Sequence, residues 1–144
     1  MSRLFDSLHK LLRVKQYHID QLRQKATLLN EQIELRLLAI EKNVSYINTE
    51  RLIASVNISG SDTLEAFVEQ KIRQNQQYVQ ENEELQKLVK EIQDQLYEAY
   101  VEQKQFEKIQ DHERVRINTE VKRKETQVID EMATQVNIKK LTKF

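Results

Sequence analysis

The fold of this chain is decided by residues 5–47, which read FDSLHKLLRVKQYHIDQLRQKATLLNEQIELRLLAIEKNVSYI. An apolar residue returns here at every seventh position, in the unbroken series Phe5, Leu12, Ile19, Ala26, Ile33, Ile40 and Ile47. Such a repeat is typical of a helix that packs along a second helix in a coiled coil. The sequence therefore predicts a helix over about residues 3–54, with Ser2 as its N-cap.

The positions three residues after this series are less regular. Only Leu8, Leu22 and Leu29 are apolar among them. Around Leu37 and Val44 the apolar stripe is expected to move one position along, as a straight helix drifts against a strict seven-residue repeat.

The composition leaves room for very few turns. The 144 residues include one Gly and no Pro, where average usage would supply about ten Gly and about seven Pro. Sheet folds built from many short elements are excluded, because each connection needs such residues. The one cluster of small polar residues is 55–62, SVNISGSD. We predict a single turn there and an all-α fold, a two-helix antiparallel coiled-coil hairpin.

The second helix is predicted over about residues 63–140. Asp62 followed by Glu65 forms a capping-box pattern at its start. Asn75 and Asn82 interrupt its apolar seam and are expected to set the register. The predicted seam runs through Leu64, Phe67, Val68, Ile72, Tyr78 or Val79, Leu85, Leu88 or Val89, Ile92, Leu96, Ala99, Phe106 and Ile109. Beyond Phe106 the apolar spacing changes to eleven residues, which relaxes a left-handed supercoil.

The two helices have unequal predicted lengths within a single domain over residues 1–144. At ~1.5 Å per residue they span ~78 Å and ~117 Å, so that Phe5 lies opposite a residue near 112 and the chain from about Glu113 protrudes. The protruding part carries the apolar residues Ile117, Val121, Val128 and Met132. Burying four such side chains contributes ~6 to 12 kcal/mol before ordering costs. We therefore predict that these residues bind another protein.

Charge is balanced overall but unevenly distributed. There are 23 basic and 23 acidic residues, with an excess of bases in residues 1–30 and an excess of acids in residues 61–100. The end where both termini meet is expected to be basic and to orient the rod in the field of a partner. The basic residues concerned are Arg3, Lys10, Arg13, Lys15, Arg114, Arg116, Lys122, Arg123 and Lys124.

Several function classes are excluded by composition. The chain has no Cys, and a single Gly cannot build a phosphate-binding loop. The spacing of His9 and His18 does not suit a shared metal ion. We expect no catalytic, cofactor or metal site, and therefore no enzyme. The run Lys122–Lys124 lacks the interleaved aromatic residues of a nucleic-acid interface, so an acidic protein surface is the expected counterpart.

Membrane insertion is not expected either. The longest apolar run, Leu37–Ile40, is far shorter than the ~20 residues that span a bilayer, and no secretory signal is present. A cytoplasmic location is therefore expected. The mixed segment Leu4–Lys15 could lie on an anionic membrane, but its apolar residues also fit the seam, which is the favoured interpretation.

Two segments resemble the C-terminal part of the flagellar FliJ proteins. They are residues 102–109, EQKQFEKI, and residues 122–133, KRKETQVIDEMA, although Met132 stands where an aromatic residue is common in the family. Phe67 and Val68, with Gln76 and Gln77 downstream, resemble the family's entry into the second helix.

The resemblance implies a central stalk of the type III export ATPase complex. Such a stalk inserts into the hexameric export ATPase ring and contacts the export-gate membrane protein and export chaperones at the inner membrane. Ile117, Val121, Val128 and Met132 would pack in the ring, the basic cluster Arg114–Lys124 would orient the rod, and Phe67 would address the gate. The alternatives are the corresponding stalk of an injectisome, a homodimeric scaffold that runs straight through Gly60, and a peripheral membrane adaptor.

Overall fold

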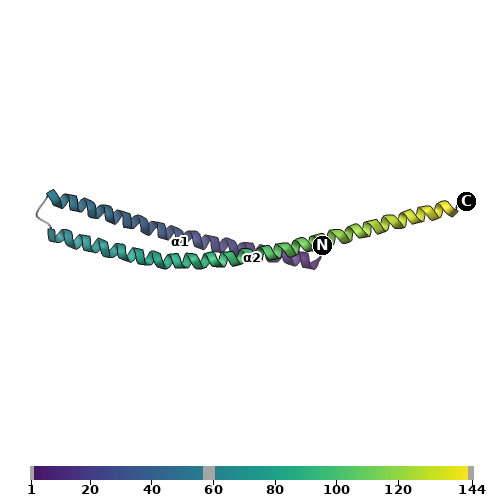
Figure 1. The fold of residues 1–144 in the computed structure, drawn as a ribbon, viewed down its shortest axis with the longest axis horizontal. Coiled ribbons are helices and arrows are strands. Elements are labelled where there is room, and N and C mark those ends of the chain that lie inside the picture. Colours follow the sequence, from purple (N-terminus) through teal and green to yellow (C-terminus); the bar gives the residue numbers. More distant parts are fainter. Residues whose placement is uncertain (1, 57–60, 143–144) are drawn as a thin grey trace. The chain divides into compact units, whose positions relative to one another are not determined.

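The computed structural model describes residues 2–56 and 61–142. They form two helices, α1 (Arg3–Val56) and α2 (Ser61–Thr142), and no strand occurs in these two ranges (Figure 1). The helices pack against each other as a hairpin, which confirms the predicted fold class. The start of α1 agrees with the prediction, and its end lies at Val56 instead of about residue 54. α2 begins at Ser61 instead of about residue 63 and ends at Thr142 instead of about residue 140. Residues 57–60 of the predicted turn lie outside the described residues.

The start of α1 is capped as predicted. The backbone N–H of Phe5 donates to the Ser2 hydroxyl over 3.1 Å, and that of Asp6 donates to the Ser2 carbonyl over 3.2 Å. The predicted N-cap role of Asp62 is wrong, because α2 already begins at Ser61. Asp62 lies instead in the first turn, where a carboxylate is favoured by the helix dipole.

Contacts within the chain group into two units. The inner unit is Ile19–Glu98, and the terminal unit is Met1–His18 together with Ala99–Phe144. In each unit a segment of α1 packs against a segment of α2, and the two segments run in opposite directions. The predicted single domain over residues 1–144 stays a prediction.

The register agrees with the sequence-based expectation. In the terminal unit the Arg114 guanidinium carbon lies 5.8 Å from the centre of the Phe5 ring, close to the predicted partner near residue 112. In the inner unit the Asn43 side-chain amide donates to Asn75 Oδ1 over 2.7 Å. The Arg36 guanidinium bonds Glu81 over 2.7 Å.

The predicted seam of α1 is covered along its whole length. All seven positions of the series from Phe5 to Ile47 are buried or half-buried, and the Ile19 side chain is fully enclosed, at 0% exposed. On α2 the covered positions follow the same repeat, with Val89 and Ala99 buried. Where the sequence left two alternatives, the structure covers Tyr78 and Val89, and it leaves Val79 and Leu88 exposed.

The predicted shift of the stripe in α1 is wrong. Leu37 and Val44 are exposed, while Asn43 between them is buried. The strict heptad position keeps the seam because Asn43 can satisfy its amide there, donating to Gln74 Oε1 over 3.1 Å as well as to Asn75. A buried amide with partners is tolerated.

Two further seam assignments in α2 are wrong by one position. Ile72 and Ile109 are exposed, whereas Lys71 is half-buried and Gln110 is buried. Lys71 is accommodated because its ammonium lies 5.5 Å from the centre of the Tyr46 ring. The heptad geometry, once set along the helix, thus overrides local hydrophobicity.

Candidate partner-binding surface

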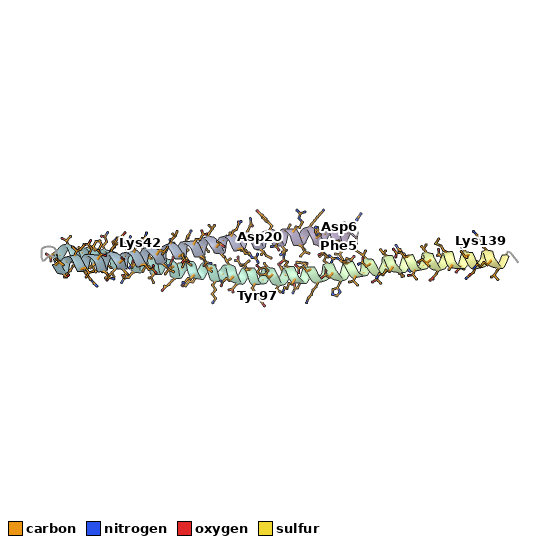
Figure 2. All side chains as sticks on the ribbon, turned by 90° about the horizontal axis from the view of Figure 1, so that it is seen from above. Phe5, Asp6, Asp20, Lys42, Tyr97 and Lys139 are labelled. Carbon is orange, nitrogen blue, oxygen red and sulfur yellow. The ribbon has the colours of Figure 1, made fainter. Side chains whose placement is uncertain are left out.

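The last part of α2 extends beyond α1 in the terminal unit. We call residues 117–142 the overhang, because the contacts of α1 described above end at Glu113 and Arg114. Figure 1 shows this part of α2 continuing past the start of α1 toward the yellow end. Every residue from Val121 to Leu141 is exposed, and Figure 2 shows Lys139 on the part of α2 that continues past Phe5. The predicted protrusion is confirmed.

The overhang carries an apolar stripe along one side. Ile117, at its start, is half-buried, whereas Val121, Val128 and Met132 are 49%, 54% and 61% exposed. At ~100° per residue these four side chains lie within about 60° of one another around the helix axis. The four predicted partner-binding residues are therefore brought together on one face.

Two more exposed residues extend this face. Ile129 adjoins Val128, and Val136 follows Met132 by one turn; both are exposed. Sequence reasoning missed them because it followed only the two eleven-residue rows. We call Ile117, Val121, Val128, Ile129, Met132 and Val136 the tail stripe. Part of it forms an open depression, lined by Val121, Lys124, Glu125, Val128 and Ile129.

The tail stripe does not continue the seam that α1 covers. Gln103, Gln110 and Ile117 follow one another at seven-residue spacing in that seam, and its next positions would be Lys124 and Glu131. The covered positions alternate steps of four and three residues, as from Glu113 to Ile117 and on to Glu120, whereas the apolar series takes a second step of four, from Ile117 to Val121. A four-residue step changes the face that a helix presents along its axis. An extension of α1 in the same heptad register would therefore not cover the tail stripe.

The three arginines of the predicted basic cluster are paired within α2. Arg116 donates to both Glu113 carboxylate oxygens, over 3.0 and 2.7 Å. Arg123 does the same to Glu120, over 3.3 and 2.8 Å. Arg114 lies 3.7 Å from Asp111.

These ion pairs change what the cluster offers to a partner. Each arginine has an acidic residue three positions earlier, a spacing that brings the two side chains together on a helix. The sequence carried that signal, which a count of charges overlooks. The cluster is thus a row of locally balanced pairs together with the exposed Lys122 and Lys124, and its net field is weaker than expected.

Glu113 joins the part of α2 just before the overhang to the start of α1. The Ser2 hydroxyl donates to Glu113 Oε1 over 2.9 Å, and the Glu113 side chain is only 9% exposed. The hydrogen bonds from Arg116, and secondly from Ser2, hold the pKa of the Glu113 carboxyl below its ordinary value of 4.5. Glu113 is therefore a carboxylate of the seam whose ionised form is stabilised by hydrogen bonds from Arg116 and Ser2.

Phe67 belongs to the inner unit, unlike the other nine predicted site residues. Its ring is half-buried, and the Lys71 ammonium lies 5.6 Å from the ring centre. The structure therefore does not bring Phe67 together with the tail stripe in one unit.

The segment weighed as a membrane-surface helix contributes its apolar residues to the seam. Leu8 is buried, Phe5 and Leu12 are half-buried, and Leu4 is exposed. This arrangement confirms the coiled-coil interpretation of the three seam residues. In the described ranges, neither helix contains a stretch with the length and hydropathy needed to cross a bilayer. Within the same ranges, no group of three or more acidic or imidazole side chains is placed to hold a metal ion.

Comparison of the chain with protein-family models, with curated proteins and with solved structures finds no match in any of the three.

Proposed function

We propose that this chain is a non-enzymatic stalk of a flagellar type III export apparatus, whose overhang inserts into the hexameric export ATPase ring. The single observation that supports the proposal most is the tail stripe. It is apolar, it is exposed from Val121 onward, and its phase differs from that of the seam. A helix with such a face is expected to dock in an apolar groove or channel of a partner.

The resemblance of residues 102–109 and 122–133 to FliJ proteins supplies the identity of that partner. The ring would receive the tail stripe, and the exposed Lys122 and Lys124 would face acidic groups at its entrance. The paired arginines Arg114, Arg116 and Arg123 would add hydrogen-bonding capacity more than net charge. The stalk would act in the cytoplasm, peripheral to the inner membrane.

The export-gate membrane protein and the export chaperones are the further partners in this proposal. Phe67 would address the gate with the exposed part of its ring. Because the Lys71 ammonium stacks on the same ring, this contact would combine an aromatic face with a positive charge.

The test is assembly of the cognate export ATPase in the presence of this chain. Ile117, Val121, Val128 and Met132 are changed together to Asp, which places four charges on the apolar face. We expect the variant to keep its far-UV helicity and to lose stimulation of ring formation and ATP turnover. Burying an ionised carboxylate in an apolar contact is unfavourable, because the carboxylate loses its hydration without gaining a partner.

A matched control places the same charges on the opposite side of the overhang. Thr119, Gln127, Thr134 and Asn137 are exposed and lie on the side of the helix away from the tail stripe by helical geometry. Their replacement by Asp should leave stimulation intact. Full stimulation by the first variant would show that the tail stripe is not the insertion surface.

A further inference from the structure

The edge of the tail stripe carries two opposite charges at heptad spacing. Lys124 and Glu131 are seven residues apart, and both are exposed, so they lie on the same edge of the stripe. Glu125 lies within the stripe, between Met132 and Val136 around the helix axis. We propose that, in the absence of its partner, the overhang binds the overhang of a second copy of this chain in antiparallel orientation.

The apolar residues of the overhang are self-complementary in this orientation. With a two-fold axis between residues 128 and 129, Val128 faces Ile129 of the second copy, and Val121 faces its Val136. Met132 faces the methylene groups of Glu125. A two-fold contact repeats each of these pairs, so the tail stripe from Val121 to Val136 is covered in both copies.

Charge favours the antiparallel over the parallel arrangement. In an antiparallel pair each edge of a helix faces the same edge of its partner. Lys124 of each copy therefore lies near Glu131 of the other, and the two-fold symmetry gives two such ion pairs. In a parallel pair, residues in the middle of the stripe would meet their own copies, which places Glu125 against Glu125 inside the apolar contact. Like charges at such a contact are unfavourable.

The length of the overhang suits this pairing. Ile117 pairs with residue 140 of the second copy, so the contact spans about 24 residues, or ~36 Å and more than three heptads. Sustained pairing over three to four heptads is the length typical of a coiled coil. The contact ends before Glu113, where Ser2 binds, so the hairpin of each copy stays intact.

The self-association goes beyond the proposed stalk function and competes with it. Both use the same apolar face, so a paired overhang cannot enter a ring. Pairing would keep the tail stripe covered before the partner is met, which reduces nonspecific association of an exposed apolar surface.

The test is the mass of the full chain alone in solution, with no ATPase present. Across a hundredfold range of micromolar concentrations, sedimentation equilibrium should show the mass rising from 17.2 kDa toward twice that value. The change Lys124→Glu or Glu131→Lys should weaken association about tenfold, because each affects two symmetric ion pairs. The double variant exchanges the two charges and should restore association to within about twofold.

The control is Lys108→Glu, which makes the same charge change at an exposed position outside the overhang and should not alter association. A mass that stays at 17.2 kDa over the whole range would overturn the proposal. So would failure of the double variant to recover, which would exclude the antiparallel pairing. A dimer that withstands Val128→Asp would show that another surface is responsible.

Discussion

Two stretches of the same helix, residues 64–113 and residues 117–141 of α2, both carry an apolar stripe, yet only the first is covered by α1. Their spacing differs, with a seven-residue repeat in the covered stretch and a four-residue step into the second. The apolar residues of the second stretch therefore leave the heptad register that α1 follows, and they stay exposed. The difference shows that periodicity, more than the amount of apolar surface, decides which partner a helix accepts.

The largest expected contrast between the two stretches is in folding stability. Ile19 is fully enclosed against α2, so Ile19→Ala should lower the free energy of unfolding by about 2–5 kcal/mol, through lost contacts and the cavity left behind. Val128→Ala in the overhang should change it by less than about 0.5 kcal/mol, because that side chain is exposed. Urea denaturation followed by circular dichroism at low protein concentration measures both. Equal effects would mean that the overhang packs on its own chain.

The polar residues of the seam give the next contrast. Asn82 Oδ1 is buried and has no hydrogen-bond partner within the described ranges, so Asn82→Leu should stabilise the chain by about 1–3 kcal/mol. Asn43→Ala should destabilise it by a similar amount, because Asn75 Oδ1 would lose its donor. The midpoint of urea denaturation tests the two opposite signs.

Asn118 in the overhang serves as the control for these amides. Its side chain is exposed, so Asn118→Leu should leave the midpoint nearly unchanged. Destabilisation by Asn82→Leu would indicate that the orphan oxygen is satisfied in solution.

The smallest expected contrast is in how local stability responds to low pH. The pKa of Glu113 is lowered in the folded chain by hydrogen bonds from Arg116 and Ser2, so the ionised carboxylate favours the folded state at pH values above its ordinary pKa of 4.5. As the pH falls through the lower folded pKa, that contribution is lost. The protection of the amides of residues 3–8, taken relative to their intrinsic exchange rates, should therefore decrease in acid, and Glu113→Gln should remove most of this dependence.

Glu120 is the matched control within the overhang. Its pKa is also lowered, by the hydrogen bond from Arg123 and the nearby positive charges. Both residues of that pair lie on α2, so Glu120→Gln should not change the exchange of residues 3–8. If it does, the two pairs act as one network.

Much of the fold was readable from the sequence because helix periodicity is a local property. The seven-residue series from Phe5 to Ile47, the Ser2 cap and the register near Phe5 all follow from spacing alone. Errors arose where the sequence offered an apolar residue beside the heptad position, as at Val44 and Ile72. A search for hydrophobic residues selects these neighbours, whereas the seam keeps Asn43 and Lys71 by giving their polar groups partners in α2 or on an aromatic ring.

The candidate surface was partly readable for the same reason. The eleven-residue rows identified Val121, Val128 and Met132, while Ile129 and Val136 lie to one side of both rows and are found only by placing all exposed apolar residues around the helix axis. The pairing of Arg116 and Arg123 with acids three residues earlier is a side-chain geometry that charge counting does not register.

The Ser2–Glu113 hydrogen bond determines how far α2 extends beyond the start of α1. It fixes where the shorter helix starts against the longer one, and so it fixes how much of α2 is left uncovered. Adding one heptad to the N-terminal side of α1, with its cap, would shorten the free projection by ~10 Å, and removing one would lengthen it by as much. The length of this projection is thus adjustable without altering any residue of the tail stripe.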